Sequence, residues 1–171
     1  MALSPALPPF QRLLDGQGTD VLRFLTAMVG VQEAEDCFQE TFLAALRAYP
    51  ELDHGQNLRG WLFTIAHRKG LDAQRRGASR PAPAGSPDEI EALHALTDAV
   101  GNAATSHVHG ADNGTVWAAI AALPPKQRSA VTLRFAGDLT HREIGAALEC
   151  SEAAARRNVH EAIRKLREQM A

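Results

Sequence analysis

The residues best suited to chemistry lie between residues 36 and 76, where acidic and amide side chains come first and basic ones last. Asp36, Gln39 and Glu40 recur at helical spacing, with Leu43 about one turn further on, and would share one flank of a helix. Basic side chains gather in the second part of the stretch, at Arg59, Arg68, Lys69, Arg75 and Arg76. Carboxylates and amides bind partner donors, whereas arginine and lysine clusters bind phosphate. The stretch therefore predicts one face for a protein and another for nucleic acid.

A polar loop separates these two groups. Residues 50–57 contain proline, glycine, aspartate, histidine, glutamine and asparagine, a composition that breaks helices. His54, Gln56 and Asn57 offer hydrogen-bonding side chains, and Trp61 follows one turn later. These side chains therefore form a polar cluster with many hydrogen-bonding groups.

The other polar clusters do not support an enzyme or a metal site. His107, His109 and Asp112 form the densest histidine cluster, but a structural zinc site needs four converging ligands and no cysteine lies nearby. Beside His67 and Asp72 there is no nucleophile, glycine-rich phosphate loop or carboxylate pair. We expect no catalytic residues, no metal and no cofactor.

The elements that position these residues are predicted to be helices, because no segment alternates long enough to be a strand. Thr19 or Asp20 is expected to cap a helix that continues to Val29. Phe38, Phe42, Leu46 and Tyr49 predict one buried stripe, and Trp61, Leu62, Ile65 and Ala66 predict another on a helix over 58–76. A short helix is expected within 87–100.

The C-terminal residues predict a helix-turn-helix. Pro124 and Pro125 precede a helix over 127–135, in which Val131 and Phe135 lie one turn apart. Thr140 and Glu143 have the spacing of a capping box, and Ser151 is placed to cap the last helix. Its predicted inner stripe is Ala155, Val159, Ala162 and Leu166, and its predicted outer face is Glu152, Ala153, Arg156, Arg157 and His160. Outer side chains near the start of such a helix are those that reach base edges.

Charge divides the chain into three parts. The net charge is −2 overall, but it is 0 over residues 1–80, −5 over 81–122 and +3 over 123–171. The fold class expected is all-α, with two small helical domains (1–77 and 115–171) joined by a flexible acidic linker (78–114). No apolar run is long enough to cross a membrane and no signal-like start is present, so we expect a cytoplasmic protein whose Cys37 and Cys150 remain thiols.

Several motifs together resemble the extracytoplasmic-function (ECF) sigma factors of bacterial RNA polymerase. Region two of that family is similar to DCFQETF at 36–42, NLRGWLFTIAH at 57–67 and LDAQRR at 71–76. Region four is similar to LPPKQR at 123–128 and LTHREIGAAL at 139–148. The resemblance implies that the chain directs core polymerase to specific promoters, recognises their upstream and downstream elements, and melts the DNA. It also implies core polymerase, promoter DNA and an anti-sigma factor as partners.

The resemblance assigns roles to three sets of residues. Core polymerase binding is assigned to Asp36, Gln39, Glu40 and Leu43. Promoter melting and the downstream element are assigned to His54, Gln56, Asn57, Arg59, Trp61, Arg68, Lys69, Arg75 and Arg76. Recognition of the upstream element is assigned to Glu152, Ala153, Arg156, Arg157 and His160.

The chain also departs from the family's pattern. Asn158 and Glu161 stand where the family usually has basic residues, and Arg157 stands where a small polar residue is usual. One alternative is a conventional helix-turn-helix regulator whose N-terminal half is a dimerisation or interaction module. For region two alone, an ordinary three-helix domain with a solvated charged face is a second alternative.

Overall fold

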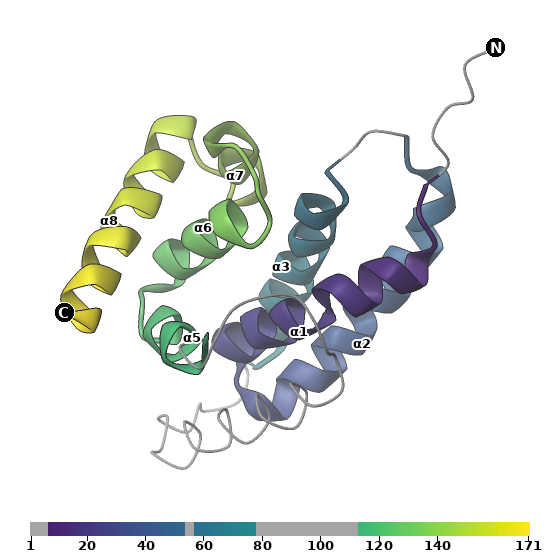
Figure 1. Cartoon of the computed structure of the whole chain (residues 1–171), viewed down its shortest axis with the longest axis horizontal. Coiled ribbons are helices and arrows are strands. Elements are labelled where there is room, and N and C mark those ends of the chain that lie inside the picture. Colours follow the sequence, from purple (N-terminus) through teal and green to yellow (C-terminus); the bar gives the residue numbers. More distant parts are fainter. Residues whose placement is uncertain (1–6, 54–56, 78–112) are drawn as a thin grey trace.

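The computed structural model describes residues 7–53, 57–77 and 113–171, and within them it is built of α-helices joined by short turns (Figure 1). The helices are α1 (Phe10–Val29), α2 (Val31–Ala48), the 3₁₀ turn η1 (Tyr49–Glu51), α3 (Leu58–Gly77), α5 (Asn113–Ala121), α6 (Pro125–Phe135), α7 (His141–Ala147) and α8 (Glu152–Met170). The predicted all-α fold is thus confirmed for these residues. The helix expected within 87–100 lies outside them, as does almost all of the predicted linker.

Helices α1, α2 and α3 form the N-terminal half, in which each helix packs against the other two. Aromatic rings provide much of its interior. Phe24 and Phe63 are fully buried with ring centroids 5.8 Å apart, and Phe38 stacks at an angle on Phe42 at 4.6 Å. Aromatic pairs at these separations add to the free energy gained by burying their surface.

Helices α5 to α8 form the C-terminal half, in which α8 packs across α6 and α7. Its core is mainly aliphatic, with Leu123, Leu133 and Ile144 among its fully buried side chains. The expected capping box is present, because Thr140 Oγ1 accepts from the Glu143 backbone N–H while the Glu143 carboxylate accepts from the Thr140 N–H at 2.7 Å. The helix-turn-helix prediction is therefore confirmed.

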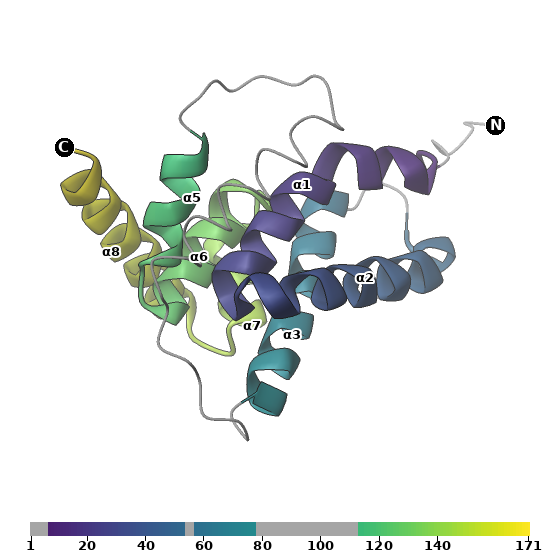
Figure 2. The ribbon, with the colours of Figure 1, turned by 90° about the horizontal axis from the view of Figure 1, so that it is seen from below.

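The two halves lie against each other, with α3 beside α6 and α1 beside α5 (Figures 1 and 2). In both views α8 lies on the side of the molecule away from α2. The buried apolar residues of the two halves form one continuous cluster. The division at 1–77 and 115–171 remains a prediction, and α5 begins two residues before the expected start at Thr115.

Two expectations about helix faces and ends were wrong, those for the start of α1 and for Leu46. Helix α1 begins at Phe10, not near Asp20. Leu46 is 50% exposed, since the buried stripe of α2 passes through Ala45 at that level. Phe135 is 63% exposed, because it ends α6 beyond the buried run Ser129–Leu133.

Candidate nucleic-acid interface

Helix α8 presents an uncovered polar face along its first two turns. Ser151 caps it, with Oγ accepting from the Ala154 backbone N–H at 3.1 Å. Ala155, Val159 and Ala162 are buried, as the predicted inner stripe requires. The predicted outer residues Glu152, Ala153, Arg156, Arg157 and His160 are all exposed. The helix is thus packed along its inner stripe and leaves its outer face exposed.

The charges on that face are arranged in local ion pairs. Arg156 donates to the Glu152 carboxylate at 3.1 Å, so one recognition candidate is held by another. Glu161 pairs with Arg164, one turn further along the helix, at 3.2 Å. Exposed pairs one turn apart are worth only a few tenths of a kcal/mol, so a phosphate or base can replace them.

The predicted protein-binding face lies on α2. Asp36 and Gln39 are exposed, and Leu43 is an exposed apolar side chain with 53% of its surface accessible. Glu40 is less accessible, because its carboxylate lies 3.8 Å from Lys69 Nζ and 3.6 Å from Arg76 Nη1 on α3. The predicted acidic and basic faces therefore meet at Glu40.

The loop residues of the melting set are only partly described. His54 and Gln56 lie outside the described residues. Asn57 caps α3, with Oδ1 accepting from the Gly60 N–H at 3.0 Å. Arg59 is exposed, and Trp61 is half-buried with its ring 6.3 Å from Tyr49. Trp61 thus lies in the first turn of α3.

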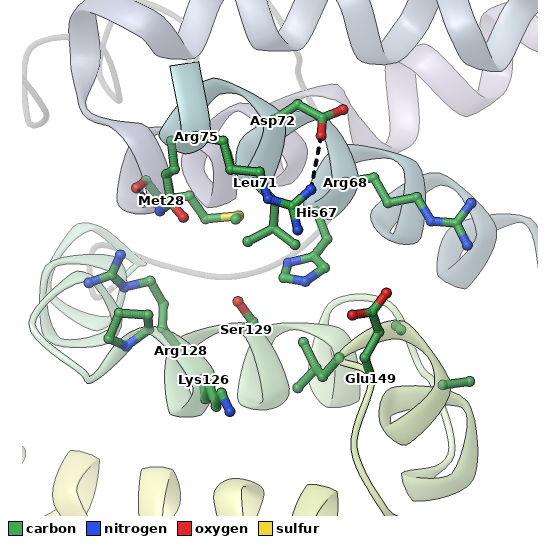
Figure 3. Close-up of a pocket in the computed structure, with 15 residues that line it drawn as sticks. Met28, His67, Arg68, Leu71, Asp72, Arg75, Lys126, Arg128, Ser129 and Glu149 are labelled. Atoms are coloured by element: carbon green, nitrogen blue, oxygen red, sulfur yellow. Dashed lines mark hydrogen bonds and ion pairs between the residues drawn. The ribbon is translucent and has the colours of Figure 1, made fainter. Parts of the chain in front are cut away.

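The basic residues of α3 divide between two environments. Lys69 and Arg76 face α2 through Glu40, and Arg75 lies 3.6 Å from Asp72 on its own helix. Arg68 is exposed and lines a pocket of about 380 Å³ between α3, α6 and the end of α7 (Figure 3). The structure does not gather all five predicted cations into one patch.

His67 points from α3 into this pocket (Figure 3). Its side chain is nearly fully buried, its ring stacks on Phe24 at 6.4 Å, and its Nδ1 has no hydrogen-bond partner in the described part of the chain. Burial, and secondarily the charge of Arg68, lower its pKa to about 4. His67 is therefore a neutral core residue at neutral pH.

The described residues contain no cluster of three or more histidine, cysteine, aspartate or glutamate side chains able to hold a metal ion. The histidine cluster at His107 and His109 lies outside them. Burial raises the pKa of the Cys37 thiol, as do the nearby carboxylates led by Glu40, so this thiol is protonated at neutral pH. Within the described ranges, every helix is too short or too polar to span a bilayer.

Sequence reasoning missed a set of contacts between the two halves. Asn57 Nδ2 donates to the carbonyl oxygens of Gly137 and Asp138, 3.0 Å from each. The Arg128 guanidinium donates to the Ala27 carbonyl across the interface and to the Ala121 and Leu123 carbonyls in its own half. Asn57 and Arg128 both stood within quoted motifs, but no local pattern indicates a partner 80 residues away.

Two family models match the chain in this order: Sigma-70 region 2 over residues 17–80 and Sigma-70, region 4 over residues 114–166. The first covers α3 with most of α1 and all of α2, and the second covers the helix-turn-helix. The match therefore includes both candidate interfaces.

Curated relatives agree with these models. The chain is 31% identical to the RNA polymerase sigma factor CarQ of Myxococcus xanthus, over 93% of this chain and 87% of that one. It is 30% identical to the ECF RNA polymerase sigma factor SigE of Mycolicibacterium smegmatis, over 97% of this chain and 63% of that one.

A solved structure agrees as well. The sigma factor RpoE of Bartonella quintana, crystallised with the anti-sigma factor NepR, is similar with a TM-score of 0.59 and 25% identity, over 94% of each chain. With region 2, region 4 and the helix-turn-helix in family order, the chain belongs to the ECF sigma factors, the promoter-recognising subunits of bacterial RNA polymerase.

Proposed function

We propose that this sigma factor divides its work among three surfaces. The α2 surface made by Asp36, Gln39, Glu40 and Leu43 docks on core polymerase. The start of α3 and its preceding loop hold the melted downstream element, and the outer face of α8 reads the upstream element. The observation that carries the proposal is the open α8 face, with all five predicted recognition residues exposed on a capped, well-packed helix.

The α2 surface has the composition of a protein-docking site. Leu43 offers exposed apolar area beside the carboxylate of Asp36 and the amide of Gln39. An apolar anchor with polar neighbours is a common arrangement in protein interfaces. Reversing charge at Glu40 together with Gln39→Ala should weaken core binding while leaving helix content unchanged, as measured by titration with labelled core enzyme and by circular dichroism.

The melting set supplies polar groups for an extruded base and cations for the backbone. We propose that Asn57 and Trp61 act at the base, with His54 and Gln56 beside them in the loop. Arg59, Arg68, Lys69, Arg75 and Arg76 would follow the phosphates, with Glu40 and Asp72 exchanged for DNA. Alanine at His54, Gln56 and Asn57 together should spare core binding but reduce permanganate reactivity of promoter thymines.

Run-off transcription with purified core enzyme on a library of promoter sequences tests the whole proposal. Arg156→Ala should lower output and relax discrimination at one upstream base pair, at a cost of about 1–3 kcal/mol in binding. Arg167→Ala is the matched control, because Arg167 is exposed near the far end of the same helix. Equal promoter preference in wild type and Arg156→Ala would contradict the assignment of Arg156 to base reading.

Partners follow from the same proposal. Core polymerase and promoter DNA are required by the activity. A protein antagonist is proposed because the similar Bartonella quintana sigma factor was crystallised with the anti-sigma factor NepR. A conventional regulator would not use the α2 surface, so co-elution with core polymerase in gel filtration separates the two functions.

A further inference from the structure

The pocket between α3, α6 and the end of α7 contains polar groups that the proposed function does not use. Its volume is about 380 Å³, within the range of small-molecule sites in proteins. His67 and Ser129 are both buried, and their side chains point toward one another across the pocket (Figure 3). Buried polar side chains that face a cavity of this size make it a candidate ligand site.

His67 carries the clearest unmet hydrogen bond in the pocket. The residue is only 3% exposed, and its Nδ1 has no partner in the described part of the chain. A buried polar atom without a partner raises the free energy of the folded protein. Each nitrogen of a neutral imidazole either donates or accepts one hydrogen bond, so Nδ1 can bond a hydroxyl group of a ligand.

Arg128 supplies positive charge that no carboxylate compensates within the described ranges. Its described hydrogen bonds all go to backbone carbonyls, those of Ala27, Ala121 and Leu123, and its Nε is buried without a partner there. Burial lowers the pKa of Arg128. A charge removed from water is costly unless an opposite charge lies close to it. An anion bound in the pocket would provide that opposite charge.

The start of α6 favours an anion at the same place. The residue before the helix, Pro124, makes no side-chain hydrogen bond to it, and the first turn has no acidic residue. The first N–H groups of a helix have no partner within it, and the helix dipole favours negative charge beside them. Lys126, in this first turn, lines the pocket and adds a second cation.

The two carboxylates of the pocket lie away from the start of α6 (Figure 3). Asp72 has its Oδ1 3.6 Å from Nη1 of Arg75 on the same helix, α3. Glu149 follows α7 and lies at the opposite end of the pocket from Arg128. Since Arg68 also lines the pocket, its cations outnumber its carboxylates. The charge distribution therefore favours an anionic group at the start of α6.

Apolar side chains complete the wall. Met28, Leu71 and Leu148 also line the pocket. Inorganic phosphate has no apolar surface to place against them, whereas an aromatic ring gains free energy from that burial. The lining therefore favours an anion with an apolar body over a bare anion.

We propose that the pocket binds a small aromatic phosphate monoester. Its phosphate, with close to two negative charges and three acceptor oxygens, binds beside Lys126 and Arg128 at the start of α6. Its ring packs on Met28 and Leu71, and a hydroxyl group on the ring bonds Nδ1 of His67. The proposal goes beyond the proposed function, since it requires neither DNA nor polymerase.

The first test is a calorimetric titration of the free, full-length protein with 4-hydroxyphenyl phosphate. This compound should bind at least about tenfold more tightly than either inorganic phosphate or hydroquinone, because each of these keeps only part of the interactions. Equal affinity for inorganic phosphate would overturn the proposal, since the ring would then contribute nothing. Absence of binding would overturn it as well.

Lys126→Gln tests the phosphate end of the site. Lys126 is exposed, so the fold should be kept, and the affinity for 4-hydroxyphenyl phosphate should fall on the order of tenfold. Lys165→Gln makes the same change on α8, outside the pocket, and should leave the affinity unchanged. Equal affinities in the two variants would mean that the phosphate lies elsewhere, and the proposal would be wrong.

His67→Leu tests the other end, with phenyl phosphate as a second compound that lacks the ring hydroxyl. The variant should bind 4-hydroxyphenyl phosphate roughly fivefold more weakly and phenyl phosphate almost unchanged, because only the hydroxyl bonds Nδ1. Circular dichroism checks that helix content is kept. An identical loss for both compounds would contradict the assignment of Nδ1 to the ligand. The titrations contain no DNA, so they can fail while run-off transcription succeeds, and the reverse.

Discussion

The two halves of the molecule reach stability by different means. The N-terminal half has three helices of 20, 18 and 20 residues, and among the described residues the close aromatic pairs all lie in it. Helices α1 and α2 begin without a side-chain cap. In the C-terminal half α5, α6 and α7 have 9, 11 and 7 residues and α8 has 19, and α7 and α8 both begin with capping side chains.

The difference matters for function. A helix held by its own cap and by a narrow inner stripe can leave its other face exposed, and α8 leaves its outer face exposed. In the N-terminal half, packed aromatic rings and the ion pairs of Glu40 hold the helices together, so the proposed core-binding surface of α2 and the proposed DNA-binding surface of α3 are directly connected. We infer that docking on α2 and events on α3 affect each other, whereas the ion pairs on the outer face of α8 stay within that helix.

The largest effect is expected from a substitution in the aromatic interior of the N-terminal half. Phe63→Ala should cost about 3–5 kcal/mol, because Phe63 is fully buried against Phe24 and a cavity would remain. Phe135→Ala is the matched control, and should change stability by less than about 0.5 kcal/mol because Phe135 is 63% exposed. Urea unfolding of both variants measures the contrast, and similar losses would mean that Phe135 is packed in solution.

The next effect depends on pH and also belongs to the N-terminal half. The pKa of His67 is about 4 when folded and about 6.5 when unfolded, so the unfolded chain binds a proton in this window that the folded chain does not. Stability is therefore lost as pH falls from 6.5 to 4, by at most about 3 kcal/mol from this group.

His67→Leu separates the contribution of His67 to the pH dependence of stability from that of the carboxylates, which titrate in the same pH range. Leucine keeps the site apolar and removes the buried Nδ1 that has no partner in the described residues. As pH falls, the unfolding free energy of wild type should decrease more than that of the variant. Parallel pH curves for the two proteins would show that His67 does not control acid sensitivity.

A smaller effect tests the capping of the C-terminal half. Thr140→Ala removes the side-chain half of the capping box and should cost about 1 kcal/mol. Hydrogen bonds from Thr140 lower the pKa of Glu143, so the box weakens as Glu143 is protonated in acid. Thr115→Ala, at an exposed position of α5, is the matched control and should be near neutral. Thermal unfolding measures both variants. Equal losses of stability for Thr140→Ala and Thr115→Ala would show that the Thr140 cap does not stabilise α7.

This contrast also explains which features could be predicted from sequence. The capping box at Thr140, the cap at Ser151 and the inner stripe of α8 are local patterns; both caps are confirmed, and so is the stripe except that Leu166 is only partly buried. The predicted start of α1 was wrong, because Thr19 and Asp20 lie within a helix that begins at Phe10 although Gly16 and Gly18 are poor helix formers. Packing overrides that preference, since Gly18 lies beside the Phe38 ring and Phe10 packs on Phe42 and Tyr49.

The candidate site follows the same rule. The outer face of α8 could be read from helical spacing, because one buried stripe defines the opposite face. The pairs of Glu40 with Lys69 and Arg76, and the bonds of Asn57 with Gly137 and Asp138, depend on how separate helices meet. No spacing within one helix indicates them. These contacts are defined only by the tertiary structure.

The smallest effects are expected from removing ion pairs, and two variants compare pairs between helices with a pair along one helix. Glu40→Gln removes two pairs that join α2 to α3, whereas Glu161→Gln removes a pair within α8. Both carboxylates are 41–47% exposed at their side chains, so solvent screens each pair and neither loss should exceed about 1 kcal/mol. We expect the Glu40 loss to be larger, because its two cations stay close together on α3 without it. Raising the salt concentration during urea unfolding should reduce both losses. Equal losses of unfolding free energy for Glu161→Gln and Glu40→Gln at low salt would contradict this expectation. The pairs of Glu40 between α2 and α3 would then not distinguish the N-terminal half from the C-terminal half.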